Sequence, residues 1–273
     1  MLELTATKRF IGALSLIVAM TGCATQNTTS TGAVGVDRGQ TMLVSSEEVD
    51  RAAGQQYAQM MAEARKKGIL NRDAAQVQRV QTIVKRLIPP TTVFRPDATK
   101  WNWEANVIST DELNAWAMPG GKIAVYTGLI EKLKLTDAEL AAVLGHEIAH
   151  ALREHSRERI SRQMATGAVV GIGAAILGVG QGGADLAGMV ADVTFNRPNS
   201  RTHESEADAI GTELAARAGY DPHGAVSVWE KMLKTGGDGP PEFLSTHPSP
   251  ENRLKQLEVI ANNLMPLYRQ ARK

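Results

Sequence analysis

A pair of histidines four positions apart constrains this chain more than any other feature of its sequence. Residues 146–150 read His-Glu-Ile-Ala-His. On a helix, residues i and i+4 lie one turn apart on the same face, so His146 and His150 can both bind one zinc ion. Glu147 would then lie beside the metal, where it can accept a proton from an attacking water. The pattern predicts a zinc-binding helix in a hydrolase that cleaves peptide bonds.

The sequence around this motif favours a helix. Thr136 and Glu139 have the spacing of a capping box, in which each side chain accepts a hydrogen bond from the other residue's backbone amide. Apolar residues follow at near-helical spacing, namely Leu140, Val143, Leu144 and Ile148. No proline interrupts residues 136–167. We therefore predict that a helix begins after Thr136 and carries both histidines.

A catalytic zinc usually has three protein ligands and one open position, so a third ligand must come from elsewhere in the chain. Residues 201–208 read Arg-Thr-His-Glu-Ser-Glu-Ala-Asp. Glu204 and Asp208 are one helical turn apart, so one carboxylate could bind the metal while the other orients a ligating histidine. Glu206 lies on a different face of the same helix, and His203 offers an alternative nitrogen ligand. Spacing alone does not choose among them.

Four motifs, taken in their order along the sequence, resemble one known family. They are the pentapeptide at 146–150, the pattern Arg-x-x-Glu-x-x-Ala-Asp-x-x-Gly at 201–211, the run Asn-Ala-Trp-Ala-Met-Pro-Gly-Gly at 114–121, and Thr-His-Pro at 246–248. Together they resemble the gluzincin metallopeptidases that include HtpX, BepA, LoiP and the Oma-type proteases, with the periplasmic lipoprotein members closest. The resemblance covers about residues 50–262.

This resemblance implies a role for each matching residue. His146, His150 and Glu204 would bind one zinc ion per chain, and Glu147 would be the catalytic base. Asp208 matches the family's second carboxylate, which acts as a proton donor or orients a ligand. A further set would form the edge strand that holds an extended peptide by main-chain hydrogen bonds: Asn114, Ala115, Trp116 and Ala117. Trp116 could instead belong to the core.

His247 has two competing interpretations. It follows a Gly- and Pro-rich stretch at residues 235–241. The resemblance to periplasmic members implies a regulatory metal ligand, a latch that keeps the enzyme inactive until substrate displaces it. Alternatively, His247 caps the final helix or stabilises the oxyanion of the transition state.

The first residues of the chain have the pattern of an export signal. Lys8 and Arg9 precede an apolar run at residues 10–20, which is too short to span a bilayer comfortably. The sequence that follows, Met-Thr-Gly-Cys, resembles a bacterial lipobox, although leucine is commoner at the position of Met20. The resemblance implies lipidation of Cys23 and sorting to the periplasmic face of the outer membrane. Because Cys23 is the only cysteine, no intramolecular disulfide can form.

The rest of the pattern predicts the organisation of the chain. We predict a signal peptide at 1–22, a flexible tether rich in Thr, Ser and Gly at 23–46, a metallopeptidase domain at 47–265 and a C-terminal tail at 266–273. His155 and His223 have no partners at ligand spacing, so we expect both to be exposed to solvent.

Within the domain, the predicted fold is α+β and mostly helical. Helical periodicity dominates residues 47–88, whereas apolar and polar residues alternate at 101–130, as in strands. Pro119-Gly120-Gly121 is typical of a tight turn. The expected fold is gluzincin-like, with a small sheet beside the active-site helix. Residues 164–189, rich in Ala and Gly, would form a buried or lid-like helical hairpin.

The predicted function is that of a zinc endopeptidase that degrades misfolded or misassembled envelope proteins. An alternative is a chaperone or assembly factor for outer-membrane proteins, in which peptide binding dominates over cleavage. The expected partners are unfolded substrates, the membrane through the N-terminal lipid, and the outer-membrane assembly machinery. A net charge of +1 with interspersed charges argues against a nucleic-acid partner.

Overall fold

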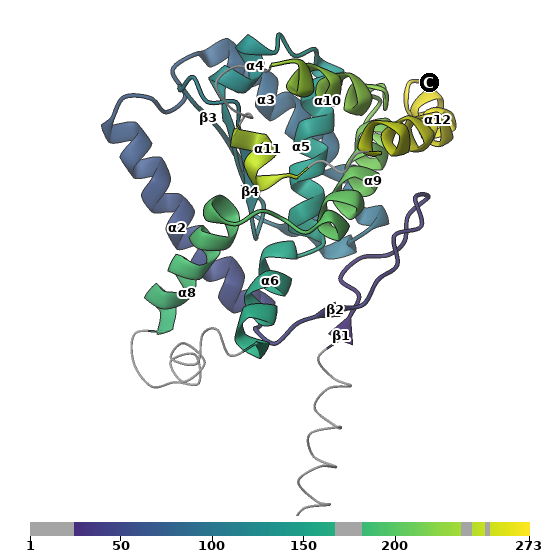
Figure 1. Ribbon diagram of the computed structural model, residues 1–273. Coiled ribbons are helices and arrows are strands. Elements are labelled where there is room, and N and C mark those ends of the chain that lie inside the picture. The colour runs from purple at the N-terminus through teal and green to yellow at the C-terminus, as the bar shows by residue number, and fades with distance from the viewer. Residues whose placement is uncertain (1–24, 167–181, 236–241, 249–251) are drawn as a thin grey trace, which may run out of the picture.

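The computed structural model describes residues 25–166, 182–235, 242–248 and 252–273 (Figure 1). Its larger helices are α2 (Ser46–Lys66), α3 (Ala74–Leu87), α5 (Asp137–Leu152), α6 (His155–Ala165), α8 (Gly182–Ala191), α9 (Arg201–Arg217), α10 (Gly224–Lys234) and α12 (Arg253–Ala271). Shorter helical segments are η1 (Pro89–Val93), η2 (Pro96–Lys100), α4 (Thr127–Lys132), η3 (Asp192–Asn196) and α11 (Glu242–Thr246). The strands are β1 (Thr25–Gln26), β2 (Gln40–Thr41), β3 (Glu104–Ile108), β4 (Ala115–Met118) and β5 (Lys122–Tyr126). This confirms the predicted α+β, mostly helical fold.

The small sheet has the strand order β3-β5-β4. Strand β5 runs parallel to β3 and antiparallel to β4, with Trp116 opposite Ala124. The predicted turn joins β4 to β5 through Gly120 and Gly121, whose φ angles of 73° and 79° favour glycine. A Cβ on Gly121 would also lie 2.7 Å from the ring of Trp103. The strand order leaves β4 at one edge of the sheet.

Helix α5 lies at the centre of the domain, between the sheet and helices α9 and α10 (Figure 1). The predicted capping box is present, because the Thr136 hydroxyl accepts from the Glu139 amide and Glu139 accepts from the Thr136 amide. Nearly every residue of α5 is buried, so the helix packs on all sides. Helix α5 ends at Leu152, and Glu154 takes a left-handed conformation with φ 50° before α6 begins.

The backbones of α5 and α9 touch at a pair of glycines. A Cβ on Gly145 would lie 2.6 Å from the carbonyl oxygen of Gly211, and a Cβ on Gly211 would lie 2.5 Å from the amide nitrogen of His146. Only glycine fits at either position without a shift of the backbone. This contact brings the 146–150 motif directly against the 201–208 segment.

The predicted flexible tether is wrong for residues 25–45, which we call the N-terminal segment. These residues lie against α6 and α9 (Figure 1, purple). The backbone amides of Ala33 and Val34 donate to Glu213, and Arg38 pairs with Glu158 and Glu206. The polar composition that resembled a tether serves instead to bind charged groups of the domain.

The predicted C-terminal tail is also wrong as far as Ala271. Helix α12 continues through Pro266, because an internal proline removes one backbone donor without preventing the following residues from remaining helical. Ala261 and Leu264 are buried and fix the helix on the domain.

Two predictions fall largely outside the described residues. The predicted signal peptide and Cys23 lie entirely outside the described residues, and so do residues 167–181 of the expected hairpin. The described part of that hairpin includes α8, whose Leu186, Met189 and Val190 pack in one cluster with residues of α2. In the described part of the chain, no helix combines the length and apolar character needed to cross a membrane.

Candidate active site

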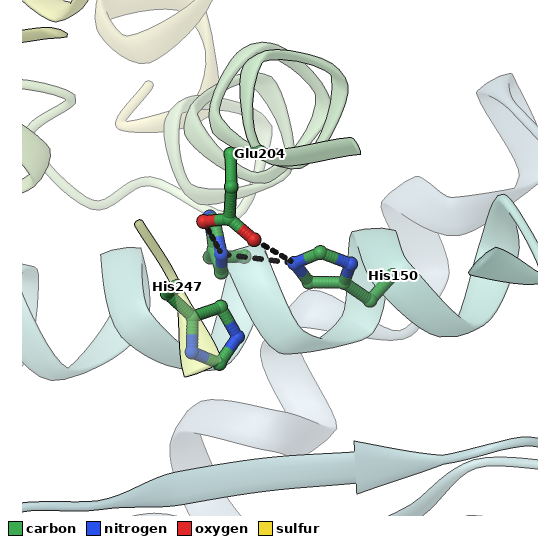
Figure 2. Close-up of side chains that lie close together, drawn as sticks. His150, Glu204 and His247 are labelled. Carbon is green, nitrogen blue, oxygen red and sulfur yellow. Dashed lines mark hydrogen bonds and ion pairs between the residues drawn. The ribbon is translucent and has the colours of Figure 1, made fainter. Parts of the chain in front are cut away.

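Four buried side chains from three parts of the chain meet beside α5. They are His146 and His150 of α5, Glu204 of α9, and His247 directly after α11. Their candidate ligand atoms all lie within 4.8 Å of one another. Figure 2 shows Glu204 reaching from α9 toward His150, with the ring of His247 nearby.

Distances within the cluster distinguish among the candidate third ligands. The Nε2 atoms of His146 and His150 are 3.0 Å apart, and each lies 3.4 Å from an oxygen of Glu204. His203 points elsewhere, stacked on His155 with its Nε2 3.2 Å from Glu158. Glu206 is also directed away from the cluster, toward Arg38. Glu204 is therefore the carboxylate that the fold brings to the two histidines.

The chemistry of these donors fits a divalent metal ion. The other ring nitrogen of each histidine is already occupied, with Nδ1 of His146 3.0 Å from Asp208 and Nδ1 of His150 2.8 Å from His155. Two imidazole Nε2 atoms thus converge on a carboxylate whose Oε1 accepts no hydrogen bond of normal geometry among the described residues. Two nitrogens and a carboxylate oxygen form the donor set that zinc prefers.

Asp208 and Arg253 contact residues of this cluster without being ligands themselves. Asp208 accepts from Nδ1 of His146, so it orients that ring and does not face the point where the four side chains meet. Arg253 is buried, with Nη2 2.7 Å from Asp208 and 3.1 Å from Glu204, and its guanidinium lies on the ring of Trp229. Arg253 belongs to the C-terminal motif that resembles the family, but no role was predicted for it, because its position depends on how α12 packs against α9.

Glu147 lies between the cluster and the edge strand. Its Oε2 accepts from the backbone amide of Ala117 at 3.2 Å, and its Oε1 is 3.3 Å from Nε2 of His247. Burial raises the pKa of Glu147 to about 8, a range in which a carboxyl group can accept and return a proton near neutral pH. The predicted edge, Asn114 to Ala117, therefore does lie beside the base. Trp116 is buried against Tyr57 and Phe195, so it belongs to the core.

His247 presents its Nε2 atom to the cluster, beside Oε1 of Glu147. Its Nδ1 donates to the carbonyl oxygen of Phe243 at 3.1 Å, because a carbonyl can only accept. Its ring stacks on Phe243, with the centroids 4.2 Å apart. In a neutral ring the lone pair is then on Nε2, and burial lowers the pKa of His247 well below its usual value. His247 thus has the position and the donor atom of a fourth ligand.

The expectation of a solvent-exposed His155 is wrong. Only 1% of its surface is exposed, and its Nδ1 contacts His150 while its Nε2 lies 2.9 Å from Glu206. Burial lowers the pKa of His155 well below its usual value, so the ring is neutral at physiological pH. The left-handed Glu154 redirects the chain after α5 and brings His155 under His150. His223, in contrast, is partly exposed beside Asp221, as expected.

Comparison with known protein families shows to which family the residues of this site belong. Residues 74–261, which include all four cluster residues, match the model of peptidase family M48. The chain belongs to peptidase family M48. The resemblance inferred from its motifs is therefore confirmed.

Several curated proteins are similar to about two thirds of this chain. The mitochondrial metalloendopeptidase OMA1 of Arabidopsis thaliana is 39% identical over 172 residues, which are 62% of this chain and 34% of that protein. The OMA1 of Schizosaccharomyces pombe is 36% identical over 185 residues, 66% of this chain and 51% of that protein. The beta-barrel assembly-enhancing protease of Escherichia coli is 29% identical over 188 residues, 66% of this chain and 38% of that protein. The chain thus spans between a third and about half of the length of these relatives.

Proposed function

We propose that this protein is a zinc-dependent endopeptidase with one zinc ion per chain. The observation that carries the proposal is the convergence of His146, His150 and Glu204, with Glu147 between this cluster and the amide of Ala117. The family supports it, because the cluster lies within the region that matches a peptidase family.

The metal, Glu147 and strand β4 would each have a separate role in peptide hydrolysis. When bound, zinc would supply a Lewis acid that lowers the pKa of water and polarises a carbonyl oxygen. Glu147 is placed to accept the proton of the attacking water and to return it to the leaving amine. The free edge of β4, on the side of Ala117, would align an extended peptide by main-chain hydrogen bonds, with little preference for sequence.

Replacement of the base tests this proposal. Glu147→Gln keeps the shape of the side chain but cannot accept a proton at neutral pH. We expect full zinc content by elemental mass spectrometry and a loss of about 10²-fold or more in cleavage of an unfolded fluorescent casein. Glu112→Gln, at an exposed residue, is the matched control and should cleave at the wild-type rate. Wild-type cleavage by Glu147→Gln would refute the role of Glu147, and wild-type protein without zinc or cleavage would refute the function.

We further infer a location in the bacterial cell envelope, with misfolded or misassembled envelope proteins as substrates. The signal-like sequence before Cys23 supports export, and the E. coli relative bears the name of a protease that enhances beta-barrel assembly. Intact mass of membrane-extracted protein should show lipid on Cys23, and Cys23→Ser should be unlipidated. Envelope proteins that co-purify with Glu147→Gln would identify the substrates.

A second candidate is an assembly factor in which peptide binding outweighs cleavage. The name of the E. coli relative favours it, and so does His247, which lies close to Glu147 and could restrain the enzyme as a latch. The two candidates differ in one outcome. If Glu147→Gln still restores outer-membrane protein assembly in cells that lack the wild-type protein, peptide binding is the relevant activity.

A further inference from the structure

A chain of hydrogen bonds connects the ligand His150 to the N-terminal segment. Nδ1 of His150 lies 2.8 Å from Nδ1 of His155, whose Nε2 lies 2.9 Å from Oε2 of Glu206. Glu206 in turn pairs with two guanidinium groups, at 2.5 Å from Nε of Arg38 and 3.2 Å from Nε of Arg153. All of these residues except Arg38 are buried. Apart from His150, none of them belongs to the metal cluster itself.

The direction of each hydrogen bond from His150 to Glu206 follows from the carboxylate of Glu206. The carboxylate of Glu206 can only accept, so Nε2 of His155 carries the proton. In a neutral ring Nδ1 of His155 is then an acceptor, and it accepts a hydrogen bond from Nδ1 of His150, which carries the proton of that ring. His150 is left with its lone pair on Nε2, the atom that faces His146 and Glu204. These hydrogen bonds therefore hold His150 in the tautomer and orientation that a metal ion requires.

The N-terminal segment supplies the outer end of this support. Arg38 contacts Glu206 and also both oxygens of Glu158 on α6, at 2.7 and 2.8 Å. Its carbonyl oxygen accepts from Nη2 of Arg153 at 3.0 Å. The buried Gln40 donates to the carbonyl oxygen of Arg153 and to Glu158. The buried Glu158 of α6 and Glu206 of α9 are thus both paired with a segment that lies far from them in sequence.

We propose that His155 is a positioning residue for the metal ligand His150, and that the N-terminal segment completes the metal centre through Arg38. The two zinc histidines are then supported differently: His146 contacts a carboxylate directly, whereas His150 reaches one through a second imidazole. The inference rests on the metal site of the proposed function. It concerns metal affinity, which is measured without substrate.

Zinc titration of the full chain against a chromophoric chelator tests the role of His155. We expect His155→Ala to bind zinc about 10–100-fold more weakly than wild type. With Co²⁺ in place of zinc, its visible absorption bands should shift, because the ring of His150 is no longer fixed. His155→Asn places an amide oxygen near the position of Nδ1, so it should accept from His150 and recover part of the affinity. A purely structural role would not predict this rescue.

A matched pair of variants tests the role of the N-terminal segment. Arg38→Gln and Glu213→Gln each weaken a contact of this segment with the domain, but only Arg38 leads to His155. We expect several-fold weaker zinc binding in Arg38→Gln and wild-type affinity in Glu213→Gln. Equal losses in the two variants would overturn the link through Arg38.

Wild-type affinity and an unchanged cobalt spectrum in both His155→Ala and Arg38→Gln would overturn the whole inference. If His155→Ala does not fold, His155→Asn and Arg38→Gln decide the question by the same readouts. Wild-type protein that binds no zinc would contradict the proposed function instead, so the two failures are distinguishable.

Discussion

Gly145 and Gly211 meet backbone to backbone, and this contact determines how closely α5 and α9 approach. Because Gly145 directly precedes the first ligand, the distance between the helices also sets the distance between His146 and Glu204. A methyl group at either glycine would separate the helices and open the metal cluster.

Gly211→Ala should therefore weaken both the fold and the metal site. The added Cβ would lie 2.5 Å from the backbone nitrogen of His146, which cannot rotate away. We expect a loss of about 1–3 kcal/mol in the free energy of unfolding and weaker zinc binding. Gly54→Ala is the control, because its Cβ meets nothing within 4 Å in the interior of α2 and should stabilise the protein slightly. Urea unfolding with and without zinc measures both effects.

Glu204→Gln should remove zinc from the purified protein. The amide lacks the negative charge that offsets the metal, although it occupies the same volume. Elemental mass spectrometry of metal content, beside circular dichroism to verify folding, gives the answer. Full zinc occupancy with wild-type cleavage in Glu204→Gln would show that another residue is the third ligand.

His247→Ala distinguishes the two interpretations of this residue by the sign of the effect. As a latch, His247 blocks the fourth position, so its removal should raise basal proteolysis and self-cleavage. As an oxyanion stabiliser, its removal should cost about 10²-fold or more in turnover. We expect the increase, because Nε2 of His247 already lies among the other ligand atoms. His223→Ala, at a partly exposed histidine, should leave the rate unchanged.

The contribution of Asp50 to the stability of the fold should be smaller at neutral than at acidic pH. Burial and the nearby charge of Glu154 raise the pKa of Asp50 to about 6. A carboxyl whose folded pKa is raised stabilises the fold fully below its ordinary pKa near 3.8, and this contribution is lost as the pH rises through 6. Asp50→Asn should thus raise the free energy of unfolding by about 1 kcal/mol at pH 7.5, allowing for its partial exposure.

The gain from Asp50→Asn should disappear near pH 4, where the wild-type carboxyl is already protonated. Asp111→Asn, at a fully exposed carboxylate, should have no effect at either pH. Denaturant midpoints across this pH range make the comparison, and an equal effect of Asp50→Asn at both pH values would contradict the assignment.

The parts of the site that depend on local spacing were predictable from sequence. The capping box at Thr136 and the i,i+4 pair of histidines are short-range patterns, so they were recognised without knowledge of the fold. The choice among His203, Glu204 and Glu206 was not available from spacing. It depends on how α9 crosses α5, which the glycine contact sets.

The positions of His155 and of the N-terminal segment could not be read from local patterns. In an uninterrupted helix, residue 155 would point away from the face of His150, and only the left-handed Glu154 brings the two rings together. The N-terminal segment has the composition of a tether, and its ion pairs with α6 and α9 join residues more than a hundred positions apart. Such long-range pairing of buried charges leaves no periodic signal in either partner.

The N-terminal segment also bears on the order in which the protein matures. It is synthesised before the domain, yet its binding partners on α6 and α9 are made much later, and His247 later still. Contacts of such high sequence separation form late in folding, after the loops between them have closed. Completion of the metal centre would therefore be one of the last folding events, because Arg38 can support it only once α6 and α9 have reached the N-terminal segment.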